Sequence, residues 1–251
     1  MLLREESADV VVCIGQTSHS WLAGQLARAW GSERFGGFAR REEVCLGAEQ
    51  HDIGWAEWDL APSLDEETGL PHAFFELSRR ESVGIWRGAP RRLEAQSRYA
   101  ALLCSLHGTL LIERFANLEE MEADDRRLTE EYLAEERRRQ QRLSAEVGGD
   151  PAEVARAREL IASWDALSLA LGHGQERTVS GVPGASETTI DLALAGSGSE
   201  WTLAPWPFAT EHVSVRCEGR RLTGRFEEEA ALHAALEDAP VVTLGFSLSP
   251  S

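Results

Sequence analysis

The chain has 251 residues, with 42 acidic residues, 25 basic residues that are all Arg, and a formal net charge of −17. With 43% hydrophobic residues, this length suffices for one large domain or two unequal ones, which excludes wholesale disorder. The negative field of such a surface repels nucleic-acid phosphates and anionic lipid headgroups. We therefore expect neither nucleic acid nor a membrane as a partner.

The first part of the chain alternates between periodic and irregular segments. A β-rich run over 9–14 precedes a helix expected from about 18 to 30, and a second helix is expected over about 42–52. Residues 59–90 contain several Pro and Gly breakers, so we expect a long loop there with at most short helical turns. Loops of this length often frame a functional site.

Helical periodicity is strong in the middle of the chain. An apolar stripe predicts a core helix over 93–115, and a charged segment over 117–147 is typical of a solvated helix. A further helix is predicted over 150–171. It begins with Asp150 at the N-cap and Pro151 at the first helical position, which is the usual order of these residue types.

The composition changes after Gly172, where β-like alternation becomes frequent. Residues 175–251 are expected to be mostly sheet, with one short helix over 226–236. The predicted fold class is therefore mainly α (α+β), a helical core with a small antiparallel sheet formed largely by the C-terminal segment. The expected domains are 1–174, which is helical, and 175–251, which packs on it and is joined by the strand at 9–14.

The cysteines and the apolar runs bear on the compartment. The four cysteines lie far apart in apolar settings, which is typical of buried, reduced thiols. No apolar stretch approaches the length of a membrane-spanning helix, and the N-terminal residues do not resemble a secretory signal. We expect a cytoplasmic protein.

Five polar side chains on otherwise apolar helix faces are the candidate functional residues: His19, His51, Asp52, His107 and Asp165. A buried carboxylate is costly unless it is paired or binds a cation. Imidazoles and carboxylates that converge between helices are suitable ligands for a divalent metal. Each residue alone also fits a hydrogen-bonded core position, so the metal hypothesis depends on their convergence.

The order His, then His-Asp, then Asp on successive predicted helices resembles the HD-domain superfamily of metal-dependent phosphohydrolases. This resemblance covers about residues 16–172 and implies that His19, His51, Asp52 and Asp165 ligate a divalent metal in a helical core. His107 would be a second-metal or substrate-facing histidine. The cofactor implied is Mn, Fe, Zn, Ni or Mg. The stretches QTSHSWLAGQLARAW, EQHDIGW, QSRYAALLCSLHG and WDALSLAL also resemble sequence blocks of an uncharacterised bacterial family.

The resemblance implies a phosphohydrolase that acts on a nucleotide or another small phosphorylated molecule through a metal-activated water. His107 and Glu57 are the candidate catalytic residues, and either Glu57 or Asp59, which both follow the His-Asp pair closely, would serve as a proton shuttle at the rim of the site. Trp55 occupies the position where many members of the superfamily carry Lys, which disfavours phosphate recognition at that point. The alternative is a non-enzymatic binding or interaction protein with a degenerate core. A homo-oligomer is compatible with either function.

Overall fold

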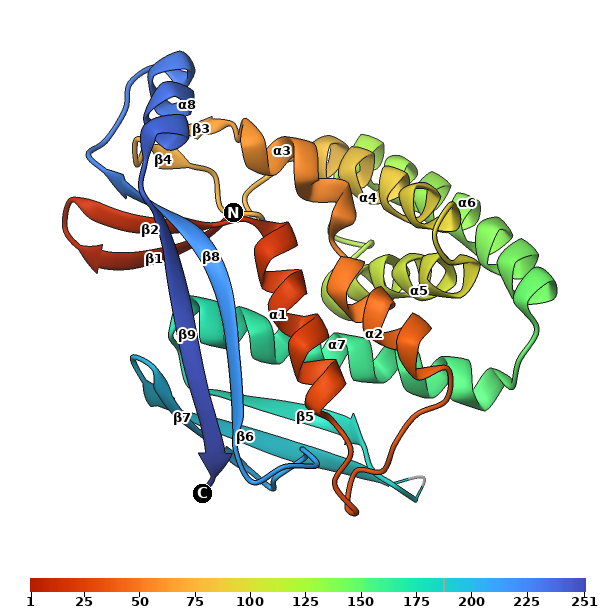
Figure 1. Cartoon of the computed structure of the whole chain (residues 1–251). Coiled ribbons are helices and arrows are strands. Elements are labelled where there is room, and N and C mark those ends of the chain that lie inside the picture. The colour runs from red at the N-terminus through yellow and green to blue at the C-terminus, as the bar shows by residue number, and fades with distance from the viewer. Residues whose placement is uncertain (187) are drawn as a thin grey trace.

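In the computed structural model, which describes residues 1–186 and 188–251, helices make up half of the chain. Figure 1 shows all of these helices except the last gathered on one side of a curled sheet, with the last helix apart from them at the upper left. The helices are α1 (Gln16–Ala29), α2 (Arg41–Gln50), the 3₁₀ helix η1 (Ile53–Trp55), α3 (Ala56–Leu60), α4 (Arg79–Glu94), α5 (Arg98–Phe115), α6 (Ala123–Val147), α7 (Pro151–His173) and α8 (Glu229–Asp238).

The strands form one sheet of seven in the order β1-β2-β8-β9-β7-β6-β5 and a separate pair, β3-β4. All neighbours in the large sheet are antiparallel except β7 and β9, which are parallel. The strands are β1 (Leu2–Ser7), β2 (Val10–Ile14), β3 (Leu64–Asp65), β4 (Leu70–Pro71), β5 (Arg177–Pro183), β6 (Thr189–Ser197), β7 (Glu200–Ala204), β8 (Val213–Thr223) and β9 (Val241–Pro250).

The predicted fold class, mainly α with a small antiparallel sheet, is wrong, because only half of the chain is helical and the sheet is large and mixed. The charged sequence of Leu2–Ser7 shows no apolar alternation, yet it pairs with β2 across a tight hairpin at the edge of the sheet. The alternation of apolar and polar residues also does not show whether neighbouring strands run parallel or antiparallel. After α8 the chain returns as β9 between β8 and β7, which makes the parallel pair.

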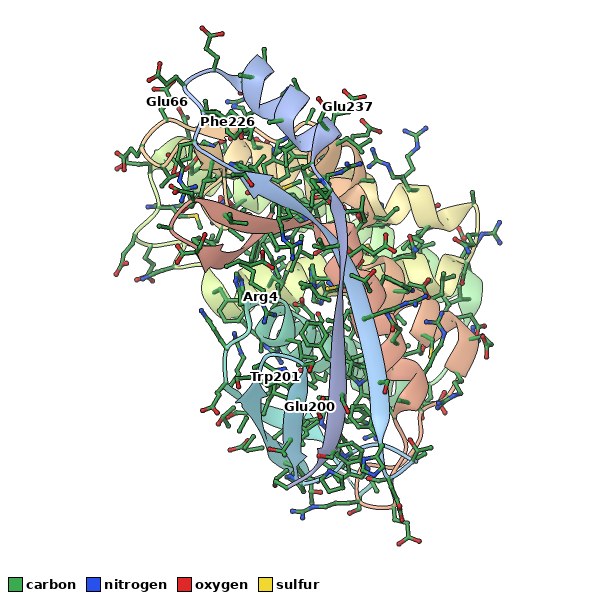
Figure 2. The ribbon with its side chains drawn as sticks, turned by 60° about the vertical axis from the view of Figure 1, so that its left-hand side comes forward. Arg4, Glu66, Glu200, Trp201, Phe226 and Glu237 are labelled. Carbon is green, nitrogen blue, oxygen red and sulfur yellow. The ribbon has the colours of Figure 1, made fainter. Side chains whose placement is uncertain are left out.

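The sheet curls around α1 and α7 (Figure 1), and their apolar faces form the main core with it. Leu22 and Leu26 of α1 and Leu171 of α7 are fully buried in this core, together with Trp201 of β7, which is labelled in Figure 2. A smaller core lies under α8, where Phe226 packs at the rim (Figure 2). The sheet therefore fixes the two helices that carry the first and last candidate residues.

Polar side chains of α1 bind the backbone of β8 beyond the point where its pairing with β2 ends. Gln25 donates to the carbonyl oxygen of Arg216 (2.8 Å) and accepts from its N–H (3.0 Å). Ser18 makes the same pair of contacts with Glu218, at 2.7 and 2.9 Å. Because unpaired strand edges need partners, these contacts complete the edge of the sheet and set the position of α1.

The expected long loop over 59–90 is also wrong, because α4 begins at Arg79. Ser78 and Glu81 form a capping box at its start. Pro90 lies inside the helix and is buried with Val83 and Leu93. This apolar packing outweighs the helix-breaking tendency of Pro and Gly in the segment.

A buried carboxylate joins α5 to α6. Glu136 accepts from Ser105 Oγ and from Arg139 Nη1, both at 2.6 Å, and Gln140 donates to the backbone oxygen of Ser105 at 3.2 Å. The side chain of Glu136 is fully buried, and this burial raises its pKa above the ordinary 4.5, although Ser105 and Arg139 oppose the shift. The network holds the helix on which His107 lies.

Stability should respond to pH through Glu136. Because its folded-state pKa is raised, protonation favours the folded state, and this contribution is lost as the pH rises through the folded pKa. We expect the free energy of unfolding of the wild type, relative to the Glu136→Gln variant, to increase as the pH falls from neutral towards 4.5. Urea unfolding of both proteins along a pH series measures this difference. A difference that is constant with pH would contradict the assignment.

Among the described residues, none of the helices is both long enough and apolar enough to traverse a bilayer. The four cysteines are all free and buried, as the sequence predicts.

Candidate metal centre

Four separate segments bring His19, His51, Asp52, His107 and Asp165 together. His19 lies in the first turn of α1, His51 and Asp52 directly follow α2, His107 is in the middle of α5, and Asp165 is in α7. The three histidines are no more than 3% exposed and Asp165 is 7% exposed. The side chains expected to converge do so, inside the protein.

The distances between donor atoms are short. His19 Nε2 lies 2.8 Å from Asp52 Oδ2, and His51 Nε2 lies 3.5 Å from both Asp52 Oδ2 and Asp165 Oδ1. Two ligand atoms that each lie about 2.1 Å from one ion are at most about 4.2 Å apart. Buried His19, His51 and Asp165 thus form a group that could hold a metal ion.

Hydrogen bonds on the far side of each imidazole fix its orientation. His51 Nδ1 donates to the carbonyl oxygen of Ala48 at 2.8 Å. Ser168 Oγ donates to the carbonyl oxygen of Asp165 at 2.8 Å, so it accepts from His19 Nδ1 at 3.0 Å. Partners of this kind are typical of metal-ligating histidines, because they select the tautomer.

In the neutral form that can bind a metal, these tautomers direct the Nε2 lone pairs of His19 and His51 at the carboxylates. Asp52 Oδ2 then faces both Nε2 atoms, at 2.8 and 3.5 Å, and Asp165 Oδ1 faces His51 Nε2 at 3.5 Å. Lone pairs repel at these distances unless a cation or a proton lies between them. The arrangement of these atoms therefore favours a bound cation or a proton at the centre.

The pKa shifts reflect the same arrangement. Burial disfavours the imidazolium of His51, but Asp52 and Asp165 outweigh burial and raise its pKa to about 9. Burial would raise the pKa of both carboxyl groups, yet the histidines lower the pKa of Asp52 and, more strongly, that of Asp165. Both carboxylates are ionised at neutral pH and available as ligands.

His107 differs from the other two histidines. Its Nε2 lies 3.6 Å from Asp165 Oδ2, and within the described residues neither of its ring nitrogens has a hydrogen-bond partner. Burial, with a contribution from His51, lowers its pKa to about 4. A neutral imidazole with unused donor and acceptor atoms is thus left beside the carboxylates.

The structure does not bring Glu57 to the centre. Its side chain is 85% exposed and forms an ion pair with Arg92 at 2.9 Å. Although it follows the His-Asp pair closely in sequence, η1 and α3 turn the chain so that Glu57 points to solvent.

Asp59 has a structural role in place of the proton-shuttle role considered from the sequence. It accepts from the backbone N–H groups of Gln16 and Thr17, both at 3.0 Å, and from the Thr17 hydroxyl at 3.1 Å. Gly15, the residue before α1, offers no side-chain cap, so Asp59 replaces it from α3. Sequence reasoning missed Ser168, although it lies one helical turn after Asp165.

Replacing Asp59 should disturb the centre indirectly. In Asp59→Ala, the first turn of α1 loses its cap next to His19, at a cost of about 1–2 kcal/mol in the free energy of unfolding. Asp59→Asn retains an acceptor and should recover part of the loss. Urea unfolding compares both with Asp124→Ala, which changes an exposed residue. Equal stability of Asp59→Ala and the control would contradict the capping role.

A cavity of about 1030 Å³ opens onto the centre. His19, Asp52, His107 and Asp165 lie in its wall, which is built from α4, α5, α7 and β5. A volume of this size accommodates a small organic molecule. The centre is therefore accessible to a substrate although its side chains are buried.

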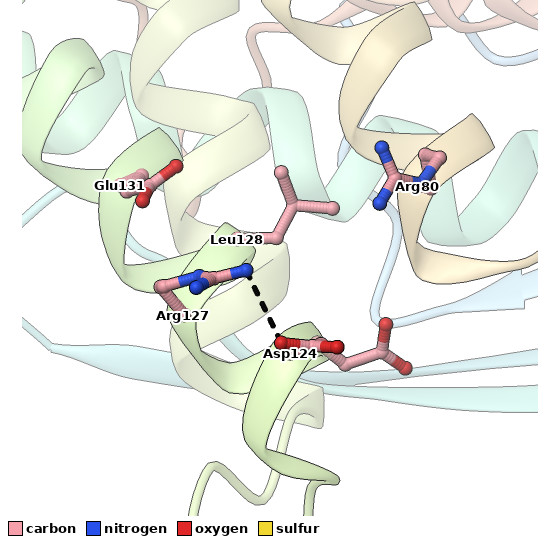
Figure 3. Close-up of a pocket in the computed structure, with 6 residues that line it drawn as sticks. Arg80, Asp124, Arg127, Leu128 and Glu131 are labelled. Carbon is pink, nitrogen blue, oxygen red and sulfur yellow. Dashed lines mark hydrogen bonds and ion pairs between the residues drawn. The ribbon is translucent and has the colours of Figure 1, made fainter.

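A second hollow, of about 230 Å³, lies between α4 and α6 (Figure 3). Its charged residues are surface side chains, and Arg127 pairs with Asp124 at 3.1 Å while both remain mostly exposed. This hollow lacks the buried, convergent groups that distinguish the centre.

The chain matches, over residues 1–224, the family described as "Protein of unknown function (DUF3891)". The chain belongs to the DUF3891 family. The match spans α1 to α7 and β1 to β8, so it includes the whole candidate metal centre of this DUF3891 protein. No curated protein and no solved structure matches the chain significantly.

Proposed function

We propose that this protein is a divalent-metal-dependent hydrolase of small phosphate esters. The observation that carries the proposal is the buried convergence of nitrogen and oxygen atoms of His19, His51, Asp52 and Asp165, a set in which His19, His51 and Asp165 could hold one metal ion. Two imidazoles with two carboxylates favour a first-row transition ion such as Mn, Fe, Zn or Ni, with Mg less favoured because it prefers oxygen ligands. The same four residues carry the resemblance to the HD-domain phosphohydrolases.

His19, His51, Asp52 and Asp165 would hold the ion. When bound, the ion would activate a water molecule and polarise an oxygen of the phosphoryl group. The two carboxylates offset its charge in the buried site, and the Ala48 and Ser168 contacts keep the imidazoles oriented.

His107 would act on the substrate. Hydrolysis forms a P–O bond to the oxygen of water and breaks the P–O bond to the alcohol, and the proton that water releases balances the one that the departing oxygen takes up. Neutral His107 lines the cavity with free ring nitrogens, so it is placed to donate an N–H hydrogen bond that stabilises charge on a substrate oxygen. Its position on α5, braced by Glu136, keeps this group fixed.

The test is hydrolysis of 4-nitrophenyl phosphate and a panel of nucleotides by protein loaded with Mn, Fe, Zn or Ni. We expect turnover that a chelator abolishes, and about 100-fold lower kcat in His107→Gln. His212→Gln, which changes an exposed histidine, is the matched control. Absence of turnover with every metal would contradict the proposal, as would equal kcat in His107→Gln and the control.

A further inference from the structure

The open end of the cavity carries exposed aromatic rings. Among the described residues, four large apolar side chains are strongly exposed: Leu60, Phe75, Phe115 and Val241. Phe75 and Phe115, which are 68% and 75% exposed, both line this cavity, while the other two do not. They come from different segments, the loop before α4 and the end of α5. Exposed apolar groups that converge on one cavity are typical of a binding surface.

Aromatic side chains continue from the open end towards the metal centre. Trp55 and Trp86 line the same cavity, together with Leu111 of α5. Trp55 is almost completely buried beside the His51-Asp52 segment. The cavity of about 1030 Å³ far exceeds the space that a phosphoryl group needs. Most of it must therefore contact the rest of the substrate, and that wall is rich in rings.

The cavity wall carries charges of both signs, because Asp52, Asp125, Glu159 and Asp165 lie in it together with three Arg side chains. Arg79, Arg114 and Arg177 lie in its wall, and Arg114 is paired with Glu159. For Arg79 and Arg177 the described part of the chain provides no ion-pair partner. Two guanidinium groups without a carboxylate partner suit an anionic ligand.

We propose that the cavity selects phosphate monoesters whose alcohol group is aromatic. The substrate's ring would pack on Phe75 and Phe115, because aromatic pairs gain stability beyond the area that they bury. This inference rests on the proposed function for one point only, the placement of the phosphoryl group at the metal centre.

Binding of phosphonates, whose P–C bond resists hydrolysis, tests the inference without turnover. The Mn-loaded protein is titrated calorimetrically with phenylphosphonate, cyclohexylphosphonate and methylphosphonate. We expect phenylphosphonate to bind about tenfold more tightly than methylphosphonate and more tightly than cyclohexylphosphonate. In the double variant Phe75→Ala/Phe115→Ala the preference over methylphosphonate should fall to about twofold. Leu60→Ala, an exposed apolar residue outside the cavity, should retain it.

Three results would overturn the inference: equal affinity for the phenyl and methyl or cyclohexyl compounds, a preference that survives in the double variant, and no binding of any phosphonate. Both Phe side chains are exposed, so the double variant should fold, which circular dichroism checks. If phenylphosphonate binds with the expected preference but no ester is hydrolysed, the aromatic selection stands and the proposed function fails. If phenyl and methyl phosphate are hydrolysed with equal kcat/KM, the proposed function stands and the aromatic selection fails.

Discussion

Replacing Asp165 with Asn should lower the affinity for Mn²⁺ at least about 100-fold, because a first ligand matters more than the outer partners that typically contribute 10- to 100-fold. Asp165 lies near all three histidines, with carboxylate oxygens 3.5 Å from His51 Nε2, 3.6 Å from His107 Nε2 and 3.9 Å from His19 Nδ1. The amide keeps the volume and the shape of the side chain but removes the negative charge. Calorimetric titration with Mn²⁺ measures the loss.

Asp124→Asn is the matched control, since it makes the same chemical change at an exposed position in α6. It should bind Mn²⁺ like the wild type. If Asp165→Asn also retains wild-type affinity, the buried carboxylate is not a ligand and the centre must be explained as an internal hydrogen-bond network.

Truncation of Trp164 to Ala should have the largest effect on stability, at about 3–5 kcal/mol in the free energy of unfolding. The side chain is fully buried and contacts the ring of Trp30 edge-on and that of Phe38 at a tilt, with ring centroids 5.7 and 5.3 Å away. Because Trp164 immediately precedes Asp165 on α7, these contacts also hold the ligand's helix in place.

The Trp164→Phe variant separates the contribution of ring packing to stability from that of the indole N–H group. The indole Nε1 is buried without a hydrogen-bond partner among the described residues, so Phe removes an unsatisfied donor while it keeps a ring. We expect Phe to cost less than half as much as Ala and to leave Mn²⁺ affinity unchanged. Urea unfolding measures both. Equal losses for the two variants would show that the ring contacts contribute little.

The candidate ligands could be predicted because each is a polar residue at an apolar position of a helix. His19, His107 and Asp165 interrupt helix faces that are otherwise buried, and that local pattern is present in the sequence. Glu57 was proposed from its nearness in sequence alone, and the short helices η1 and α3 carry it away from the centre.

The residues that orient the ligands could not be predicted, because no local sequence pattern marks them. Asp59 caps a helix more than 40 positions earlier in the chain, and Ser168 contacts His19 across 149 positions. These contacts exist only after α1, α3 and α7 have packed. The charged strand β1 and the parallel pairing of β9 were hidden for the same reason, since both depend on distant partners rather than on local alternation.

The measurement that tests the central claim most directly is elemental analysis of protein prepared without chelator or affinity-tag metal and then incubated with Mn, Fe, Ni or Zn. The wild type should retain about one ion per chain, and His51→Ala and Asp52→Ala, if folded by circular dichroism, should retain almost none. If the wild type holds no metal under any of these conditions, protons rather than a metal ion lie between His19, His51, Asp52 and Asp165. The account of this site is then wrong.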